Sequence, residues 1–164
     1  MLANVVVDQR KVYIDELTVV GVPIRTTDRA EEKGTGTIPA HWDMFYKQQM
    51  ANKIANKVNG KMFALYADYE LLNPIEFTFA LGYEVTPGGE LREEMQEFTI
   101  PAGEYMVFTT AIGPAKQMVL DAWSYIWEWS NKNERAFVLD FELYDERCID
   151  PDFSQVDIYV SIKS

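Results

Sequence analysis

Two short segments near the end of the chain each place a carboxyl group and a phenol two residues apart. Glu142 and Tyr144 stand in DFELYDERC, and Asp157 and Tyr159 stand in VDIYV. Alternate residues of a β-strand point to the same face, so each pair is expected to project from one side of its strand. If the two strands are neighbours, the acids and phenols form one patch. A carboxylate in such a patch could neutralise a bound cation or act as a general base.

The same alternation has a plainer interpretation. Asp140, Glu142 and Asp157 alternate with apolar residues such as Phe141 and Ile158. This pattern is also typical of strands in a half-exposed sheet, whose polar side faces water. Alternation alone leaves both interpretations open.

Aromatic residues on two predicted helices could cover the patch. The helices are expected over residues 38–60 and 114–131, because apolar residues recur there at helical spacing. Their matching aromatic and apolar positions are Trp42, Phe45 and Tyr46 in the first helix and Trp123, Ile126 and Trp127 in the second. Rings at this spacing pack in a core in many proteins, so these residues are candidates for either a core or a cavity wall.

The elements that position these residues follow one order twice. In the first half we predict a strand over 12–27, a polar loop over 28–37, the first helix, and strands over 61–70 and 75–85. In the second half we predict a strand pair or one kinked strand over 95–113, the second helix, and strands over 136–148 and 155–163.

This recurrence predicts an internal duplication. The two halves, about 12–86 and 95–164, would pair into one mainly antiparallel sheet with both helices packed across it. We therefore expect a single α+β domain spanning residues 1–164, made of two strand-helix-strand-strand repeats. A cleft or pocket is expected near the pseudo-two-fold axis.

The net charge narrows the classes of partner. The chain has 164 residues and a formal net charge of −11. Such a chain repels a phosphate backbone, so we expect no direct binding of DNA or RNA. The same negative field favours the approach of cations, although acidity serves solubility alone in many proteins.

Cysteine content and hydropathy bear on location. Cys148 is the one cysteine of the chain, which excludes an internal disulfide and a thiolate metal cluster and fits a reducing compartment. The sequence has no apolar stretch long enough for a bilayer and no features of a secretion signal. We expect a cytoplasmic protein without membrane association.

Little in the sequence favours catalysis. His41 is the one histidine, and we expect a surface or helix-capping role for it beside Trp42 rather than a metal site or a catalytic triad. Cys148 has no histidine near it in the sequence, and neither a phosphate loop nor a dinucleotide-binding glycine pattern is present. We therefore expect no metal, no cofactor and no enzymatic activity.

Six segments together resemble a known family of binding domains in their order and approximate spacing. They are ALYADYE, LGYEV, IPAGEYMVFTTAIG, AWSYIWEW, FELYDER and VDIYVSIK. The combination resembles the gyrase-inhibitor-like (GyrI-like) effector-binding domains, which stand at the C-termini of AraC-type and MerR-type transcription activators and also occur alone. The resemblance covers most of the chain from about Lys61 onward.

The resemblance implies a hydrophobic, aromatic-lined pocket at the junction of two repeats. In drug-sensing members the pocket takes lipophilic cations, and an acidic residue meets the positive charge. Glu142 in FELYDER holds the position of that acid, and Asp157 and Tyr159 in VDIYV hold those of a second acid and a tyrosine. Ser161 replaces the proline of many members, and Asp157 is shorter than their glutamate.

Members that regulate transcription carry a helix-turn-helix domain ahead of this one. Here the pattern begins almost at Met1. The resemblance therefore implies a stand-alone module, like those of mobile integron cassettes. Whether its binding serves gene regulation, sequestration or inhibition of a protein stays open.

We therefore expect a module that binds lipophilic organic cations. A carboxylate is costly to desolvate without a partner, an organic cation supplies that partner, and ring faces add cation-π attraction. Two alternatives remain: a small hydrolase with Glu142 as general base beside a tyrosine, and a gyrase-inhibitor-like module that binds a protein. The candidate ligand-binding residues are Glu142, Tyr144, Asp157, Tyr159, Trp123, Trp127, Phe45 and Trp42.

Overall fold

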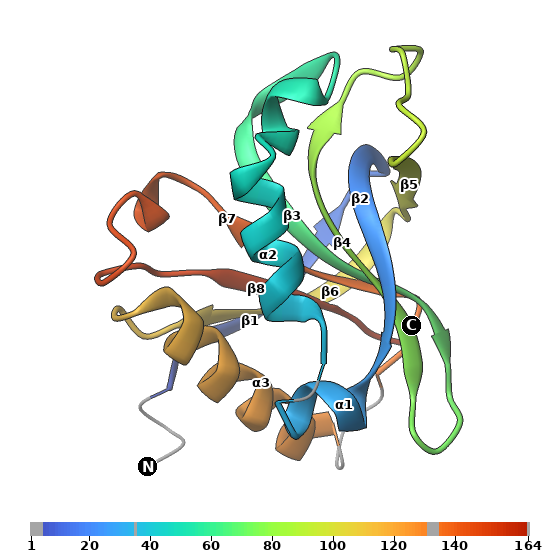
Figure 1. Cartoon of the computed structure of the whole chain (residues 1–164). Coiled ribbons are helices and arrows are strands. Elements are labelled where there is room, and N and C mark those ends of the chain that lie inside the picture. The colour runs from blue at the N-terminus through green and yellow to red at the C-terminus, as the bar shows by residue number, and fades with distance from the viewer. Residues whose placement is uncertain (1–4, 35, 131–134, 164) are drawn as a thin grey trace.

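The computed structural model of the chain describes residues 5–34, 36–130 and 135–163 (Figure 1). Its strands form one sheet of eight in the order β1-β6-β8-β7-β3-β4-β2-β5, with antiparallel neighbours throughout. The strands are β1 Val6–Ile14, β2 Leu17–Thr27, β3 Lys57–Glu70, β4 Glu76–Val85, β5 Gln96–Ile100, β6 Gly103–Thr110, β7 Leu139–Tyr144 and β8 Asp157–Ser161. The helices are α1 Asp28–Glu32, α2 Ile38–Lys47 and α3 Ala115–Ser130, with short 3-10 helices at Met50–Lys53 (η2) and Glu146–Cys148 (η3). The predicted α+β class is confirmed.

The sheet is built from two copies of one unit, and the strand that precedes each copy pairs with the other copy. One unit is β2, α2, β3 and β4, and the other is β6, α3, β7 and β8. The strand that precedes each unit joins the edge of the other: β1 pairs with β6, and β5 pairs with β2. The pair β3–β7 joins the two units at the centre of the sheet.

The central pair shows where the pseudo-two-fold axis passes. The segments FALY (63–66) in β3 and FELY (141–144) in β7 differ at one position, Ala64 against Glu142. In the antiparallel register Ala64 lies directly opposite Glu142. An axis that relates the two segments must pass between these residues, so Glu142 stands on the axis of the molecule.

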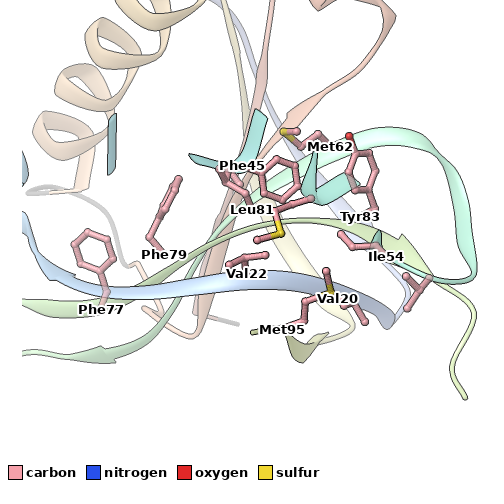
Figure 2. Packing of buried hydrophobic residues seen from close by; sticks show 13 residues of the cluster. Val20, Val22, Phe45, Ile54, Met62, Phe77, Phe79, Leu81, Tyr83 and Met95 are labelled. Atoms are coloured by element: carbon pink, nitrogen blue, oxygen red, sulfur yellow. The ribbon is translucent and has the colours of Figure 1, made fainter. Parts of the chain in front are cut away.

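Helices α2 and α3 lie on the same face of the sheet, in front of it in Figure 1. Each packs on its own unit, because its apolar stripe faces the strands of that unit. Phe45 of α2 points into a cluster with Leu81 and Tyr83 of β4, shown in Figure 2. Ile126 of α3 packs in a second cluster with Ile158 of β8.

The opposite face of the sheet buries a third cluster, whose members all lie on strands or beside them in the described ranges. The strong twist of the sheet brings its own strands together there. This cluster includes Phe63, Leu65, Phe98, Ile100 and Phe141.

Helix α3 agrees with its predicted range, but α2 is shorter than predicted. The segment 38–60 ends its helix at Lys47, and β3 begins at Lys57. Gln49 and Asn56 adopt left-handed backbone conformations, with φ of 50° and 62°, which interrupt a right-handed helix. The Asn59-Gly60 signal, predicted to end the helix, instead lies inside β3.

Two other predicted boundaries are wrong. The strand expected over 12–27 is two strands, β1 and β2, which separate at Asp15 and Glu16 and pair with different neighbours. The loop expected over 28–37 contains the short helix α1, whose first turn is capped by the Thr27 hydroxyl accepting from the N–H of Ala30. None of the helices within the described residues has the length and apolar character needed to cross a membrane.

Strands β2 and β4 approach each other closely at a pair of glycines. Gly21 lies opposite Gly82 in the register of the two strands. A Cβ atom at Gly82 would lie 2.0 Å from the carbonyl oxygen of Val20. Only a residue without a side chain fits at this position.

Candidate functional site

The carboxylate of Glu142 is enclosed by three hydrogen-bond donors on the helix-covered face of the sheet. Tyr66 Oη donates to Oε2 at 2.5 Å, and Trp123 Nε1 donates to the same oxygen at 2.7 Å. Tyr144 Oη donates to Oε1 at 2.6 Å. The residue is 2% exposed. Strand alternation places Tyr144 beside Glu142 on β7, and the turn spacing of α3 brings Trp123 over them.

Burial controls the protonation of this cluster. Desolvation raises the pKa of Glu142 above its ordinary value, although the donors Tyr144, Tyr66 and Trp123 act in the opposite direction. Desolvation and the neighbouring carboxylate raise the pKa of Tyr66 and Tyr144 well above 10, so both phenols stay protonated and remain donors at neutral pH.

Aromatic rings surround the carboxylate in a nearly symmetric way. Trp123 of α3 meets Tyr66 edge to face at 5.1 Å between centroids, and Trp42 of α2 meets Tyr144 in the same manner at 5.1 Å. These two contacts correspond to each other under the pseudo-two-fold axis. Both ring pairs lie around Glu142, which the axis passes.

Glu142 differs from two other buried acids in having no positive partner. Asp140 pairs with Arg135 at 2.6 Å, and Asp157 pairs with Arg147 at 2.9 Å. None of the ion pairs between described residues includes Glu142. Its partners are the neutral donors of the ring cluster.

A second polar cluster adjoins Glu142 on the same face of β7. Asp140 Oδ2 accepts from Arg135 Nη2 and from Tyr69 Oη, each at 2.6 Å. Its Oδ1 accepts from the backbone N–H of Ser161 at 2.8 Å. Asp140 therefore ties β7 to the segment before it and to the end of β8.

The patch of acids and phenols expected from the sequence does not form. Strands β7 and β8 are neighbours, but Phe141 lies opposite Tyr159, and Glu142 lies opposite Ile158. Asp157 and Tyr159 therefore face the other side of the sheet. Tyr159 stacks on Phe141 there at 4.5 Å.

The other predicted residues divide between the site and the core. Glu142, Tyr144 and Trp123 come together, with Trp42 beside Tyr144. Trp127, 38% exposed, lies over Arg135 instead. Phe45 is core: it is 1% exposed and belongs to the cluster under α2.

His41 is buried, contrary to the predicted surface or capping role. Its Nε2–H donates to the carbonyl oxygen of Val22 at 2.6 Å, which anchors α2 to β2. Burial lowers the pKa of His41, so the ring is held neutral. Among the described residues, no group of three or more His, Cys, Asp or Glu residues is arranged to hold a metal ion.

Glu142 is shielded from solvent by its neighbours. Two surface hollows border other residues: Phe63, Leu143 and Tyr159 line one, and Pro101 and Val138 line the other. Neither includes Glu142. The side chains that touch the carboxylate are those of Tyr66, Trp123 and Tyr144.

Tyr66 is the site residue that sequence reasoning missed. Its position predicts only a place in the strand over 61–70, whereas in the structure it donates to Glu142 at 2.5 Å. The repeat contained the signal, because Tyr66 occupies in FALY the place that Tyr144 occupies in FELY.

Comparison with known proteins identifies the family. The family model described as integron-associated effector binding protein, Cass2, matches residues 11–162. The protein YobU of Bacillus subtilis (strain 168) is 35% identical over 152 residues, which are 92% of this chain and 95% of YobU. The transcriptional regulator BrlR of Pseudomonas aeruginosa is 38% identical over 93 residues, which are 53% of this chain but 33% of BrlR.

Comparison with solved structures leads to the same family. The integron cassette protein VCH_CASS2 of Vibrio cholerae is 25% identical, with a TM-score of 0.77, and 96% of this chain and 97% of that chain are covered. The structure of SAV2435 bound to tetraphenylphosphonium has a TM-score of 0.79 at 18% identity, over 96% of this chain and 94% of that chain. The resemblance seen in the sequence is confirmed: the chain belongs to the Cass2 family of integron-associated effector binding proteins.

Proposed function

We propose that this protein binds lipophilic organic cations, with Glu142 as the counter-ion and the surrounding rings as the walls of the site. The observation that carries the proposal is the missing positive partner. Asp140 and Asp157 are buried with arginines, whereas Glu142 is buried with neutral donors only. A buried carboxylate without a counter-ion is costly, and a cation that enters the site recovers this free energy.

The rings determine which cations fit. Faces of Trp123, Trp42, Tyr66 and Tyr144 can take up a cation by cation-π attraction once it is desolvated. Delocalised or shielded charges lose their water more easily than ammonium groups do. The site therefore favours lipophilic cations. It tolerates variety among them, because neither ion pairing with Glu142 nor cation-π attraction requires strict hydrogen-bond geometry.

For a ligand to reach Glu142, side chains of α2 or α3 have to move. Tyr144 packs against both the cluster under α2 and the cluster under α3. Trp42 lies at the margin of the cluster under α2 and Trp123 at the margin of the cluster under α3, so a rotation of either ring would expose Glu142 while the fully buried members of both clusters stay in place. A fold relative, SAV2435, is known with tetraphenylphosphonium bound, which supports this class of ligand by analogy of fold.

The test uses ligands of one shape and three charges. Tetraphenylphosphonium, tetraphenylmethane and tetraphenylborate are titrated against the protein, with tryptophan fluorescence as the signal. We expect the phosphonium to bind and the borate not to bind. Glu142→Gln should weaken phosphonium binding at least about tenfold, or about 1.4 kcal/mol.

The control variant is Glu104→Gln, which removes an exposed carboxylate and should leave the affinity unchanged. Equal affinity for the phosphonium in wild type and Glu142→Gln would refute the charge role. In that case the buried acid serves the fold alone.

One observation favours a second function, a hydrolase. A carboxylate with a raised pKa beside two phenols could serve as a general base. Mass spectrometry of electrophilic ligands after incubation separates the two functions. A hydrolase converts them and loses turnover in Glu142→Gln, whereas a binding module returns them intact.

A further inference from the structure

Arg135 is a buried cation, and some of its hydrogen-bond donors have no acceptor among the described residues. Its side chain is 1% exposed, and its Nη2 donates to Asp140 at 2.6 Å. Its Nε and Nη1 are buried and have no hydrogen-bond partner within the described part of the chain. Buried donors without an acceptor are rare because each one loses its hydration without replacement. Two guanidinium nitrogens, Nε and Nη1, are thus left without an acceptor among the residues that the structure describes.

The guanidinium group lies over three aromatic rings. Its Cζ lies 4.1 Å from the ring centroid of Phe137, 4.8 Å from that of Trp127 and 5.7 Å from that of Trp123. Rings cover the faces of a guanidinium group and leave its N–H groups directed outward in its plane. The ion pair with Asp140 fixes the orientation of that plane.

This group adjoins the cation site. Trp123 contacts both, because its Nε1 donates to Glu142 while its ring faces Arg135. Asp140 and Glu142 are alternate residues of β7, so their side chains leave the same face about 7 Å apart. An organic cation of ordinary dye size spans this distance.

We propose that Arg135 is a subsite of the effector site for a hydrogen-bond acceptor, so that a ligand with its positive charge at Glu142 also places a neutral carbonyl oxygen on the unpartnered Nη1 of Arg135. This inference rests on the proposed function. Asp140 already neutralises Arg135, so the subsite needs an oxygen acceptor but no negative charge. A carboxylate on the ligand would instead meet the two acids, Asp140 and Glu142, on the same face of β7. The ligand class is therefore a lipophilic cation bearing an ester, amide or ketone.

Three xanthylium dyes that differ in one substituent test the inference. Tetramethylrosamine lacks a carbonyl group, tetramethylrhodamine methyl ester carries a neutral one, and tetramethylrhodamine carries the free acid. Fluorescence anisotropy gives the dissociation constant of each dye. In wild type we expect the ester to bind about tenfold more tightly than the rosamine, and the acid to bind no more tightly than the ester.

The informative quantity is the ratio of the rosamine and ester dissociation constants within each variant. Arg135→Lys keeps a positive charge near Asp140 but loses the guanidinium fork, and Arg135→Met removes both. The ratio should fall to about one in both. Arg25→Lys, which alters an exposed arginine of β2, should keep the wild-type ratio. Thermal melts show whether each variant is folded.

The outcomes separate this inference from the proposed function. Binding of all three dyes that depends on Glu142, with equal affinities for rosamine and ester, overturns the acceptor subsite alone. Tighter binding of the free acid than of the ester also overturns it, because the subsite would then require an anion. Failure of every dye to bind overturns the proposed function, and the subsite with it.

Discussion

The carboxyl group of Glu142 couples proton binding to cation binding. Its pKa is raised by burial, so its proton must leave before a cation can take its place. The affinity for tetraphenylphosphonium should therefore fall about tenfold for each pH unit below this raised pKa and level off above it. Titrations at a series of pH values from neutral to acid provide the measurement.

The phenols that face Glu142 do not add a second pH dependence to the affinity for tetraphenylphosphonium. Burial and the carboxylate of Glu142 raise the pKa of Tyr66 and of Tyr144, so both phenols stay protonated throughout the series. In Glu142→Gln the affinity should not vary over the same range. A wild-type affinity as flat as that of the variant contradicts the coupling.

Single residues of the site were predictable to the extent that local patterns encode them. Glu142 and Tyr144 share a face of one strand, which alternation predicts, and both lie in the cluster. Tyr66 required comparison of the two repeats. Arg135 lies outside the predicted helices and at no periodic position, and its role depends on tertiary contacts with Asp140 and Trp127.

At the scale of elements, the register between β7 and β8 determines which face of the sheet carries Asp157 and Tyr159, and the sequence does not predict that register. Alternation predicts that Asp157 and Tyr159 share a face, and they do, but it gives no information on how β8 is aligned with β7. A shift of one residue in that alignment exchanges the two faces. The observed register sets Tyr159 against Phe141, so the second acid and tyrosine lie across the sheet from Glu142.

The contact of β2 with β4 depends on the glycine at position 82. In Gly82→Ala the new methyl group would lie 2.0 Å from the carbonyl oxygen of Val20, which requires the strands to separate. We expect a loss of about 3 kcal/mol in the free energy of unfolding, measured by urea denaturation. Gly60→Ala is the matched control, because a Cβ there has nothing within 4 Å. It should change stability by at most about 0.5 kcal/mol, and equal losses in both variants would disprove the steric account.

At the scale of the whole molecule, the duplication allows one acid on the axis. Ala64 faces Glu142 across the central strand pair. Ala64→Glu would place two carboxylates opposite each other in a buried position, and we expect it to cost about 3 kcal/mol or more of stability at neutral pH. Chemical denaturation of Ala64→Glu and Ala64→Gln measures this.

The comparison isolates charge from size. Ala64→Gln introduces nearly the same volume without a second charge, so it should be the more stable variant at neutral pH. The difference should shrink in acid, where a carboxyl group of the pair is protonated. If the two variants are equally destabilised at all pH values, volume rather than charge excludes a second glutamate.

The exchange of β1 and β5 between the units has a consequence for cooperativity. Each unit depends on a strand from the other to complete its edge, so local opening of one unit strips hydrogen bonds from its neighbour. The chain should consequently melt in a single transition instead of unit by unit. A ligand bound beside Glu142 would then slow hydrogen exchange at the amide groups of the distant edge strands as much as at the residues that it contacts.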